Sequence, residues 1–397
     1  MRIGPLLAAA FFAACAADAK ALELSDDLTI TGYGDLRTVS AASPTSWLRG
    51  GLGKFRYGDG GTHLRFAEAV AQADWAINEE WDAVAVLRAE PLTPGVVDAL
   101  EAYLHYAPAS DGAVSWSVKS GAFFPTISLE NDDLGWASPY TLTPSAINSW
   151  IGDELRSIGS EATMRWKNDF GTLSLIAAII CCNDENGTLM AARGWTLGDR
   201  PMGLFERVRL PEQPPKRTGM FDEIDGRPGW YAGATWQVPG WGKVSVIRYD
   251  NQGDPYAKTS RDAGWNTRFW SVGARTDIGG VMLIAQAMRG QTIVAGPRFY
   301  SDTKFQSAFL LASYDLDDWR FSAREDLFAT RRAGARNTLR SEDGDAFTAS
   351  ISWSRFAWLR LTGEVIALNS RRGEYVPAGL GLNRDDTQVQ FSTRFFF

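Results

Sequence analysis

Apolar and polar residues alternate along most of this chain, in runs of about ten residues that are bounded by turn residues. In the stretch WRFSARED, Trp319 and Phe321 share one face, whereas Arg320, Arg324 and Asp326 share the other. The stretches VDALEAYLHYA, SIGSEATMRWK and QVQFSTRFFF alternate in the same way. Because successive side chains of a strand point to opposite faces, each run predicts a β-strand with one apolar and one charged face.

The connections between these runs alternate in length. Short turns are predicted near Asn78, Asp111, Asn168, Pro239, Asp277, Asp317 and Arg355. Longer segments are predicted at residues 40–62, 91–96, 125–154, 181–228, 250–264, 291–303, 329–344 and 369–384. Seven short and eight long connections join 16 strands, and a count of 18 strands also fits the pattern.

Tryptophan residues gather at the short turns. Three short turns have a tryptophan on each side: Trp75 and Trp81, Trp236 and Trp241, and Trp353 and Trp358. Trp166 precedes a fourth turn, and Trp319 follows a fifth. An indole ring favours the boundary between hydrocarbon and water, so a row of indoles along one rim is typical of a transmembrane β-barrel. A soluble β-sandwich would also alternate, but it would not explain this rim.

The two ends of the chain agree with a barrel. Residues 1–21 have the order of a secretory signal peptide: an early Arg2, a short apolar run and small-residue cleavage sites. A lipoprotein signal ending at Cys15 is the weaker interpretation. Residues 22–397 are then the barrel. Lipid cannot satisfy open backbone groups, so the last strand must pair with the first, Leu28–Thr38, and Phe395 and Phe397 would lie at the lipid boundary.

Composition and charge place two limits on the protein. The chain is 45% hydrophobic and 22% charged, which is typical of a folded protein, and its formal net charge of -7 argues against nucleic acid as a partner.

The chain resembles the outer-membrane porins of Gram-negative bacteria. The signal peptide, the terminal FSTRFFF, the alternation of short turns with long loops, and the long loop after the fifth strand carry this resemblance. The stretches LENDDLGWASPYTLTPSAINSWIGDELRSIG and ARTDIGG are similar to those of porin-like proteins of α-proteobacteria.

The resemblance implies an all-β antiparallel barrel in the outer membrane, with short periplasmic turns and long extracellular loops. It also implies that the barrel-assembly machinery reads the terminal phenylalanines Phe395 and Phe397. Outer-membrane lipids and small hydrophilic solutes are the other implied partners, and porins of this size are commonly homotrimers.

A barrel of this size can enclose water, so charged inward side chains are candidates for the pore lining. The candidates are Asp35, Arg37, Glu101, Arg156, Glu161, Arg165, Arg275, Arg320, Arg324, Asp326, Arg360, Glu364 and Arg394 on the wall, and Glu130, Asp132 and Asp133 in the loop 125–154. By resemblance this loop narrows the lumen, and its acidic side chains would face wall residues such as Arg320 and Arg324. The alternatives are that the wall charges only pair across strands and that the loop covers the mouth. Residues 181–228 are expected to form a long external loop, either a cap or an extra hairpin.

These features predict a channel for passive diffusion of small hydrophilic solutes. The alternatives are a channel selective for anions or organic acids and a closed structural barrel. No enzymatic activity is predicted. The chain has only two histidines, His63 and His105, and neither lies in a sequence motif that pairs it with a nucleophile. No cofactor or metal site is predicted either, since ENDD lacks the spacing of a calcium loop. Cys181 and Cys182 are interpreted as small apolar residues at a strand end.

Overall fold

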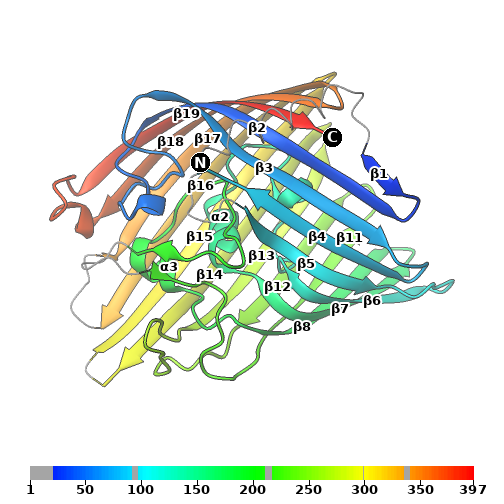
Figure 1. The fold of residues 1–397 in the computed structure, drawn as a ribbon, viewed down its shortest axis with the longest axis horizontal. Coiled ribbons are helices and arrows are strands. Elements are labelled where there is room, and N and C mark those ends of the chain that lie inside the picture. Colours follow the sequence, from blue (N-terminus) through cyan, green and yellow to red (C-terminus); the bar gives the residue numbers. More distant parts are fainter. Residues whose placement is uncertain (1–20, 92–96, 211–216, 298, 335–339) are drawn as a thin grey trace.

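Sixteen antiparallel strands close into a barrel, with the last strand, β19, paired to β2 (Figure 1). The computed structural model describes residues 21–91, 97–210, 217–297, 299–334 and 340–397. The predicted barrel of 16 strands is confirmed, and the alternative count of 18 is wrong. The predicted signal peptide lies almost entirely outside the described residues.

The ring follows chain order from β2 to β19. The short strand β1 pairs with β2 at its edge, and β9 and β10 form a separate two-stranded sheet. Its strands are β2 (Leu28–Ala42), β3 (Thr62–Ala76), β4 (Trp81–Ala89), β5 (Val97–Tyr106), β6 (Val114–Phe123), β7 (Ser157–Asn168), β8 (Gly171–Cys181), β11 (Gly229–Val238), β12 (Gly242–Asp250), β13 (Asn266–Ile278), β14 (Val281–Gly296), β15 (Phe299–Leu316), β16 (Trp319–Gly334), β17 (Glu342–Phe356), β18 (Leu359–Arg372) and β19 (Asn383–Phe396). The other elements are β1 (Leu22–Ser25), β9 (Val208–Arg209), β10 (Arg217–Thr218), the helices α2 (Ala146–Glu154) and α3 (Thr188–Arg193), and the 3-10 turns η1 (Trp47–Arg49), η2 (Leu134–Trp136) and η4 (Gly373–Tyr375).

All seven predicted short turns lie at one end of the barrel, and the longer connections lie at the other. Two of the expected long segments are mostly strand. β14 runs to Gly296 and β15 begins at Phe299, so residues 291–303 hold only a tight link. Likewise, β16 and β17 take up much of residues 329–344. The ladder continues here, with Gly296 opposite Phe299 and Ser301 opposite Gly334.

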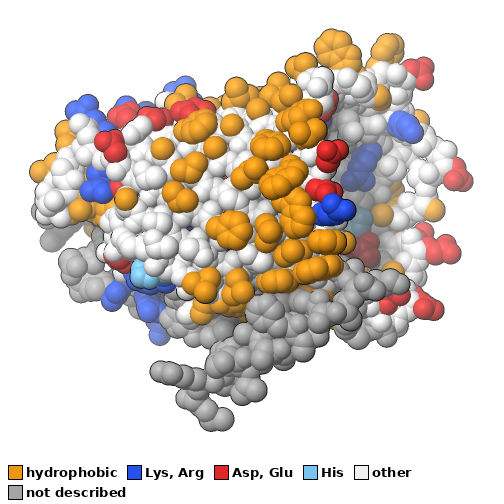
Figure 2. Space-filling model, turned by 90° about the horizontal axis from the view of Figure 1, so that it is seen from above, with side chains coloured by type: hydrophobic (Ala, Val, Ile, Leu, Met, Phe, Trp, Pro, Cys, Tyr) orange, Lys and Arg blue, Asp and Glu red, His pale blue; other side chains and the backbone are white. Residues whose placement is uncertain are grey.

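The outer wall is apolar and carries the tryptophan rim. Trp75, Trp166 and Trp236 are each about half exposed, and Trp319 is 44% exposed. Figure 2 shows hydrophobic side chains gathered over the face of the wall in view. The outward direction predicted for the apolar face of these strands is therefore confirmed.

One predicted face is interrupted by a bulge. The pairing of β4 with β5 shifts between Val86 and Leu87, whose partners are Glu101 and Ala99. Leu100, between these partners, is fully buried in a cluster with Val86 instead of facing outward as its alternation suggests. A bulge inserts one unpaired residue and so reverses the faces on one side of it.

Two chain segments lie inside the barrel: residues 124–156, which carry α2, and much of residues 182–210, which carry α3 (Figure 1). A buried cluster joins Trp150 of α2, Met190 of α3 and Trp195 to inward residues of β8 and of β11 through β18, among them Phe269 and Phe305. These helices thus cover an apolar cluster on the inner wall from β8 to β18, while buried charged side chains line the wall at β2, β3, β4, β16, β18 and β19. Within the described part of the chain, no helix has the length and apolar character needed to cross a membrane.

Candidate functional site: the charged interior of the barrel

The segment 125–154 is held against the inner wall through the start of α2. Ser145 caps this helix, since its hydroxyl oxygen accepts a hydrogen bond from the Asn148 amide at 3.2 Å. The Ala146 amide donates to Asp326 of β16 at 2.9 Å. A carboxylate at a helix N-terminus meets unpaired amides and the positive end of the helix dipole, so Asp326 fixes this helix to the wall.

Arg324, on the same strand, binds the residues just before α2. Its guanidinium donates to the Thr143 carbonyl at 2.8 Å, the Pro144 carbonyl at 3.0 Å and the Thr141 hydroxyl at 3.0 Å, and it pairs with Asp326 at 2.7 Å. The Arg324 side chain is fully buried. One planar group therefore satisfies several backbone oxygens of the segment and holds it at a fixed position.

The acidic side chains of the segment contact basic wall residues directly. Asp132 pairs with Arg275 and Asp133 with Arg360, both at 2.7 Å. Glu130 lies 3.9 Å from Arg324 and accepts a bond from the Ser145 amide. The sequence predicted acidic and basic groups on facing surfaces, and the structure brings them into contact instead of leaving them across a water-filled gap.

The remaining predicted residues lie in three environments. Glu364 accepts the Thr143 amide at 3.0 Å, Glu101 accepts the Phe124 amide at 2.8 Å, and Glu161 accepts the Tyr231 hydroxyl at 2.5 Å, so these three serve the inserted segment or the wall. Arg156 is buried over the Phe124 ring at 3.5 Å. Arg320 pairs with Asp315 and donates to the Pro139 carbonyl, while Arg165 is exposed near the turn end.

The segment 182–228 is only partly the external loop that was expected. β9 and β10 do form a small hairpin, but every residue of α3 is buried. Lys54 donates to the carbonyls of Arg193 and Trp195, and the Arg372 guanidinium donates to that of Ala192. The apolar residues of α3 and its neighbours need burial, and the apolar inner wall provides it.

Beyond α3, this segment joins a buried ionic network on the opposite wall. Asp199 pairs with Arg37 of β2 and lies 3.1 Å from Arg56. Arg200 pairs with Glu90 and, at 2.6 Å, with Glu206. Burial alone would raise the pKa of Asp199, but Arg37 and Arg56 hold that pKa below its ordinary value.

A small cavity, called the passage below, lies between this wall and the two inserted segments. Its cavity volume is about 20 Å³. Its charged lining consists of Glu68, Arg88, Asp199, Arg200 and Arg394. A cavity of this size holds roughly one water molecule. The passage therefore lies between the ionic network of the wall and the two inserted segments.

Of these five lining residues, only Arg394, on the alternating polar face of the last strand, was among the predicted lining residues. Glu68 and Arg88 each lie in a mostly apolar run, FAEAVA and VAVLRAE. A single charged residue in such a run could have been used to predict an inward, functional side chain. Asp199 and Arg200 lie in an irregular segment, where alternation gives no information.

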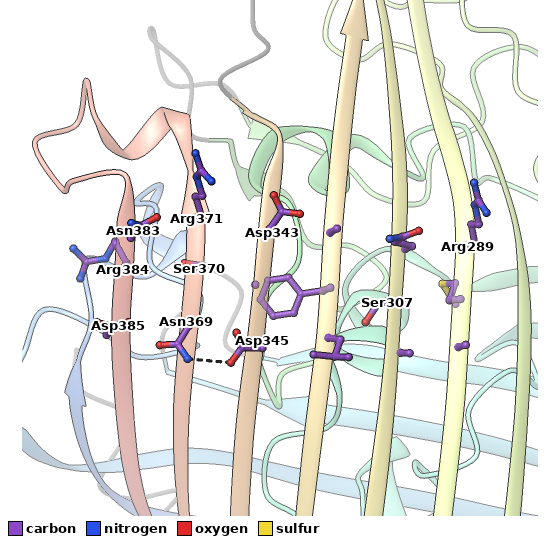
Figure 3. Close-up of a pocket in the computed structure, with 18 of the residues that line it drawn as sticks. Arg289, Ser307, Asp343, Asp345, Asn369, Ser370, Arg371, Asn383, Arg384 and Asp385 are labelled. Atoms are coloured by element: carbon purple, nitrogen blue, oxygen red, sulfur yellow. Dashed lines mark hydrogen bonds between the residues drawn. The ribbon is translucent and has the colours of Figure 1, made fainter.

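A larger groove of about 890 Å³ lies on the outside of the wall (Figure 3). Residues paired across neighbouring strands form two adjacent rows that cross the groove from β13 to β19. One row contains Ala287, Ala308 and Asp345, and the other contains Arg289 and Arg371. Small alanines make the depression. Because its side chains point away from the lumen, this groove is separate from the passage.

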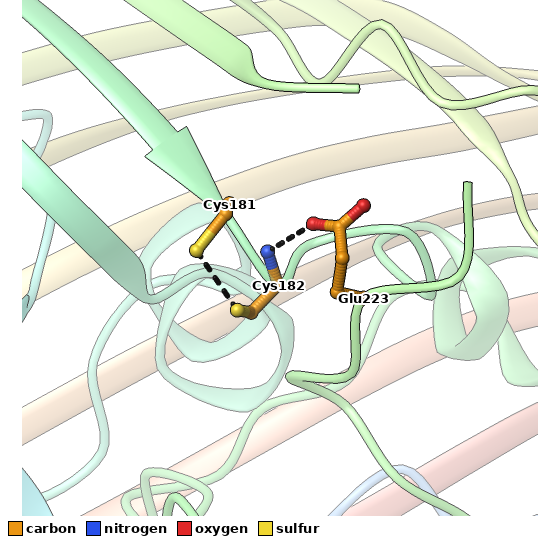
Figure 4. A group of neighbouring side chains, drawn as sticks. All are labelled: Cys181, Cys182 and Glu223. Carbon is orange, nitrogen blue, oxygen red and sulfur yellow. Dashed lines mark hydrogen bonds between the residues drawn. The ribbon is translucent and has the colours of Figure 1, made fainter. Parts of the chain in front are cut away.

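Cys181 and Cys182 lie at the end of β8, as expected. Their sulfur atoms are 2.9 Å apart, and Cys182 has a φ of 60°, so the chain turns sharply here. The Cys182 amide donates to Glu223 (Figure 4).

Comparison with known proteins supports the fold. No family model and no curated protein matches the chain. The outer-membrane channel DcaP of Acinetobacter baumannii is similar in structure, with a TM-score of 0.59 and 11% identity over 96% of this chain and 100% of that one. A loop-deletion mutant of OmpT, an outer-membrane protein of Vibrio cholerae, has a TM-score of 0.53 and 12% identity over 94% and 100%. An anion-selective porin of Comamonas acidovorans has a TM-score of 0.52 and 13% identity over 93% and 99%.

The chain therefore has the fold of outer-membrane porins, and the resemblance drawn from the sequence is confirmed at that level. The narrower likeness to α-proteobacterial proteins stays a prediction.

Proposed function

We propose that this protein is a porin of the Gram-negative outer membrane, through which small hydrophilic solutes diffuse down their gradient. The observation that carries the proposal is the charged passage between the wall and the two inserted segments, inside a barrel whose outer face is apolar. Water and ions need such a polar path, because the hydrocarbon around the barrel offers none. The outer-membrane lipids and the barrel-assembly machinery are the partners that this role requires.

The segment 125–154 is the constriction in this proposal. It packs on the apolar cluster of the inner wall and borders the passage with its charged lining. Single-channel recordings of a variant that lacks residues 128–150 test this role. Conductance should rise, since the segment no longer occupies the lumen. Unchanged conductance of a correctly folded variant would exclude the constriction.

The lining of the passage carries more arginines than carboxylates. Three arginines and two carboxylates line it, which gives the lining an excess of one positive charge. A low-dielectric neck strengthens the field of each group. Selectivity for anions or organic acids is thus the second candidate, and a reversal potential measured in asymmetric KCl separates it from a neutral pore.

An enzyme is the less favoured alternative. His105 lies 2.9 Å from Asp82, but this pair is near the turn end and away from the passage. Hydrolysis of ester and peptide substrates by the purified protein would contradict the channel as its sole activity. The homotrimer stays a prediction, and light scattering of the detergent complex tests it.

A further inference from the structure

Two acidic stretches at the ends of the segment 182–228 lie side by side. NDEN (183–186) follows β8, and DEID (222–225) precedes β11. Asp184 accepts hydrogen bonds from the amides of Ile224 at 2.6 Å and Asp225 at 3.0 Å, and Glu185 accepts one from Asp222 at 3.0 Å. The start and the end of the long segment are thus joined through carboxylates.

These contacts gather three carboxylates around one point. One oxygen each of Asp184, Glu223 and Asp225 lies within 4.8 Å of the others. Among the described residues, no Lys or Arg forms an ion pair with any of the three. A neighbouring trio, Glu185 with Asp222 and Asp262, differs in that Arg207 pairs with its two aspartates.

The first trio has an unused ligand atom. Asp184 is fully buried, and within the described chain its Oδ1 has no hydrogen-bond partner. A buried carboxylate oxygen without a donor is costly, and an ion is one of the few groups that can compensate it.

The ligand chemistry selects the ion. Calcium binds carboxylate oxygens at about 2.3–2.6 Å, so two oxygens on one ion are at most roughly 5 Å apart. The spacing of the trio meets this limit. Cys181 and Cys182 lie beside Glu223, as Figure 4 shows, but thiolates are soft ligands that suit zinc instead.

We propose that Asp184, Glu223 and Asp225 form a calcium site that clamps the two ends of the segment 182–228. The part of the segment between the clamped ends carries α3 and the passage residues Asp199 and Arg200. Calcium therefore restrains the inserted segment and its passage residues. The effect on conductance rests on the proposed channel function, whereas ion binding does not.

Terbium luminescence tests the site directly, because Trp265 is close enough to sensitise the bound ion: its amide donates to the Asp184 carbonyl at 2.7 Å. The full chain, purified in detergent and stripped with EGTA, should show saturable luminescence that millimolar CaCl₂ displaces and equal MgCl₂ does not. Asp184→Asn should weaken terbium binding at least about tenfold, the effect expected from removing one charged ligand. Asp184→Asn keeps an oxygen for the two amide bonds, so this variant should fold.

Glu223→Gln provides a second variant, and Asp111→Asn, an exposed aspartate of a short turn, is the matched control. Luminescence that is absent, or equal in Asp184→Asn and the wild type, would overturn the proposal, as would displacement by ZnCl₂ but not CaCl₂. Conductance without ion binding would contradict the calcium site alone. Ion binding by a barrel that does not conduct would contradict the channel alone.

Discussion

Gly32 and Phe397 exchange two backbone hydrogen bonds, each 3.0 Å long, and so join the first barrel strand to the last residue of the chain. The Phe397 ring lies over Gly32, where a side chain would also come within 2.6 Å of the Val70 carbonyl oxygen. The terminal aromatic residue is thus part of the barrel seam.

Gly32→Ala should destabilise this seam. Overpacking of a tight contact costs about 1–3 kcal/mol, and the cost falls on the pairing that closes the barrel. We expect a lower melting temperature by circular dichroism in detergent and less heat-modifiable folded protein on gels. Gly363→Ala is the matched control, because its added carbon would meet only Ile351, at 3.6 Å. Equal melting temperatures of the two variants would contradict the account of the seam.

Arg324→Gln should release the segment 125–154 from the wall. The change removes a buried ion pair with Asp326 and the bonds to the residues before α2. Breaking one partner of a buried pair costs about 3–5 kcal/mol. Chemical denaturation should show the lower free energy of unfolding. Single-channel recordings should show conductance steps that are larger or noisier than those of the wild type. The exposed Arg165→Gln should match the wild type in both measurements, and an Arg324→Gln variant that does the same would refute the role of this arginine as an anchor.

Neutralising single charges in the passage should shift ion preference in opposite directions. Arg88→Gln removes a positive group and Glu68→Gln a negative one from the same lining. One charge at close range is worth roughly 1 kcal/mol in a solvated neck, or about a fivefold change in permeability ratio. Reversal potentials in asymmetric KCl should therefore move toward cations for Arg88→Gln and toward anions for Glu68→Gln. Shifts of the same sign would show that ions follow another route.

Stability should fall as the pH rises through neutrality. Burial raises the pKa of Glu130 and of Glu154 in the inserted segment to about 7 each. The unfolded chain has an ordinary glutamate pKa of about 4.3, so the folded state holds the protons more tightly. Their contribution is complete below about pH 4 and is lost as the pH approaches and passes 7. Denaturation midpoints at pH 5 and pH 8 measure the fall, which Glu130→Gln should reduce; an unchanged difference would assign it to other groups.

The sequence was sufficient to predict the strands of the barrel wall, but not the segments that lie inside the barrel. Strict alternation in stretches such as WRFSARED fixes both faces of a strand, and the turns near Asp277 and Asp317 divide the strands correctly. In β15, however, Phe305, Phe309 and Leu311 face inward beside outward Leu310, so both faces are apolar. Alternation of apolar and polar residues cannot predict which segment covers the inward face of β15.

The passage and the calcium site depend on contacts between distant segments. Asp199 meets Arg37 across 162 positions, and Asp184 meets Asp225 across 41. Only the folded chain brings such residues together, because an irregular segment has no period from which a side-chain direction can be read.

The most direct test of the account is the conductance of the purified, folded wild-type protein in a planar lipid bilayer. The account predicts discrete steps of small size, which become larger when residues 128–150 are removed. A folded barrel that inserts into the bilayer and gives no steps, with or without those residues, would contradict it.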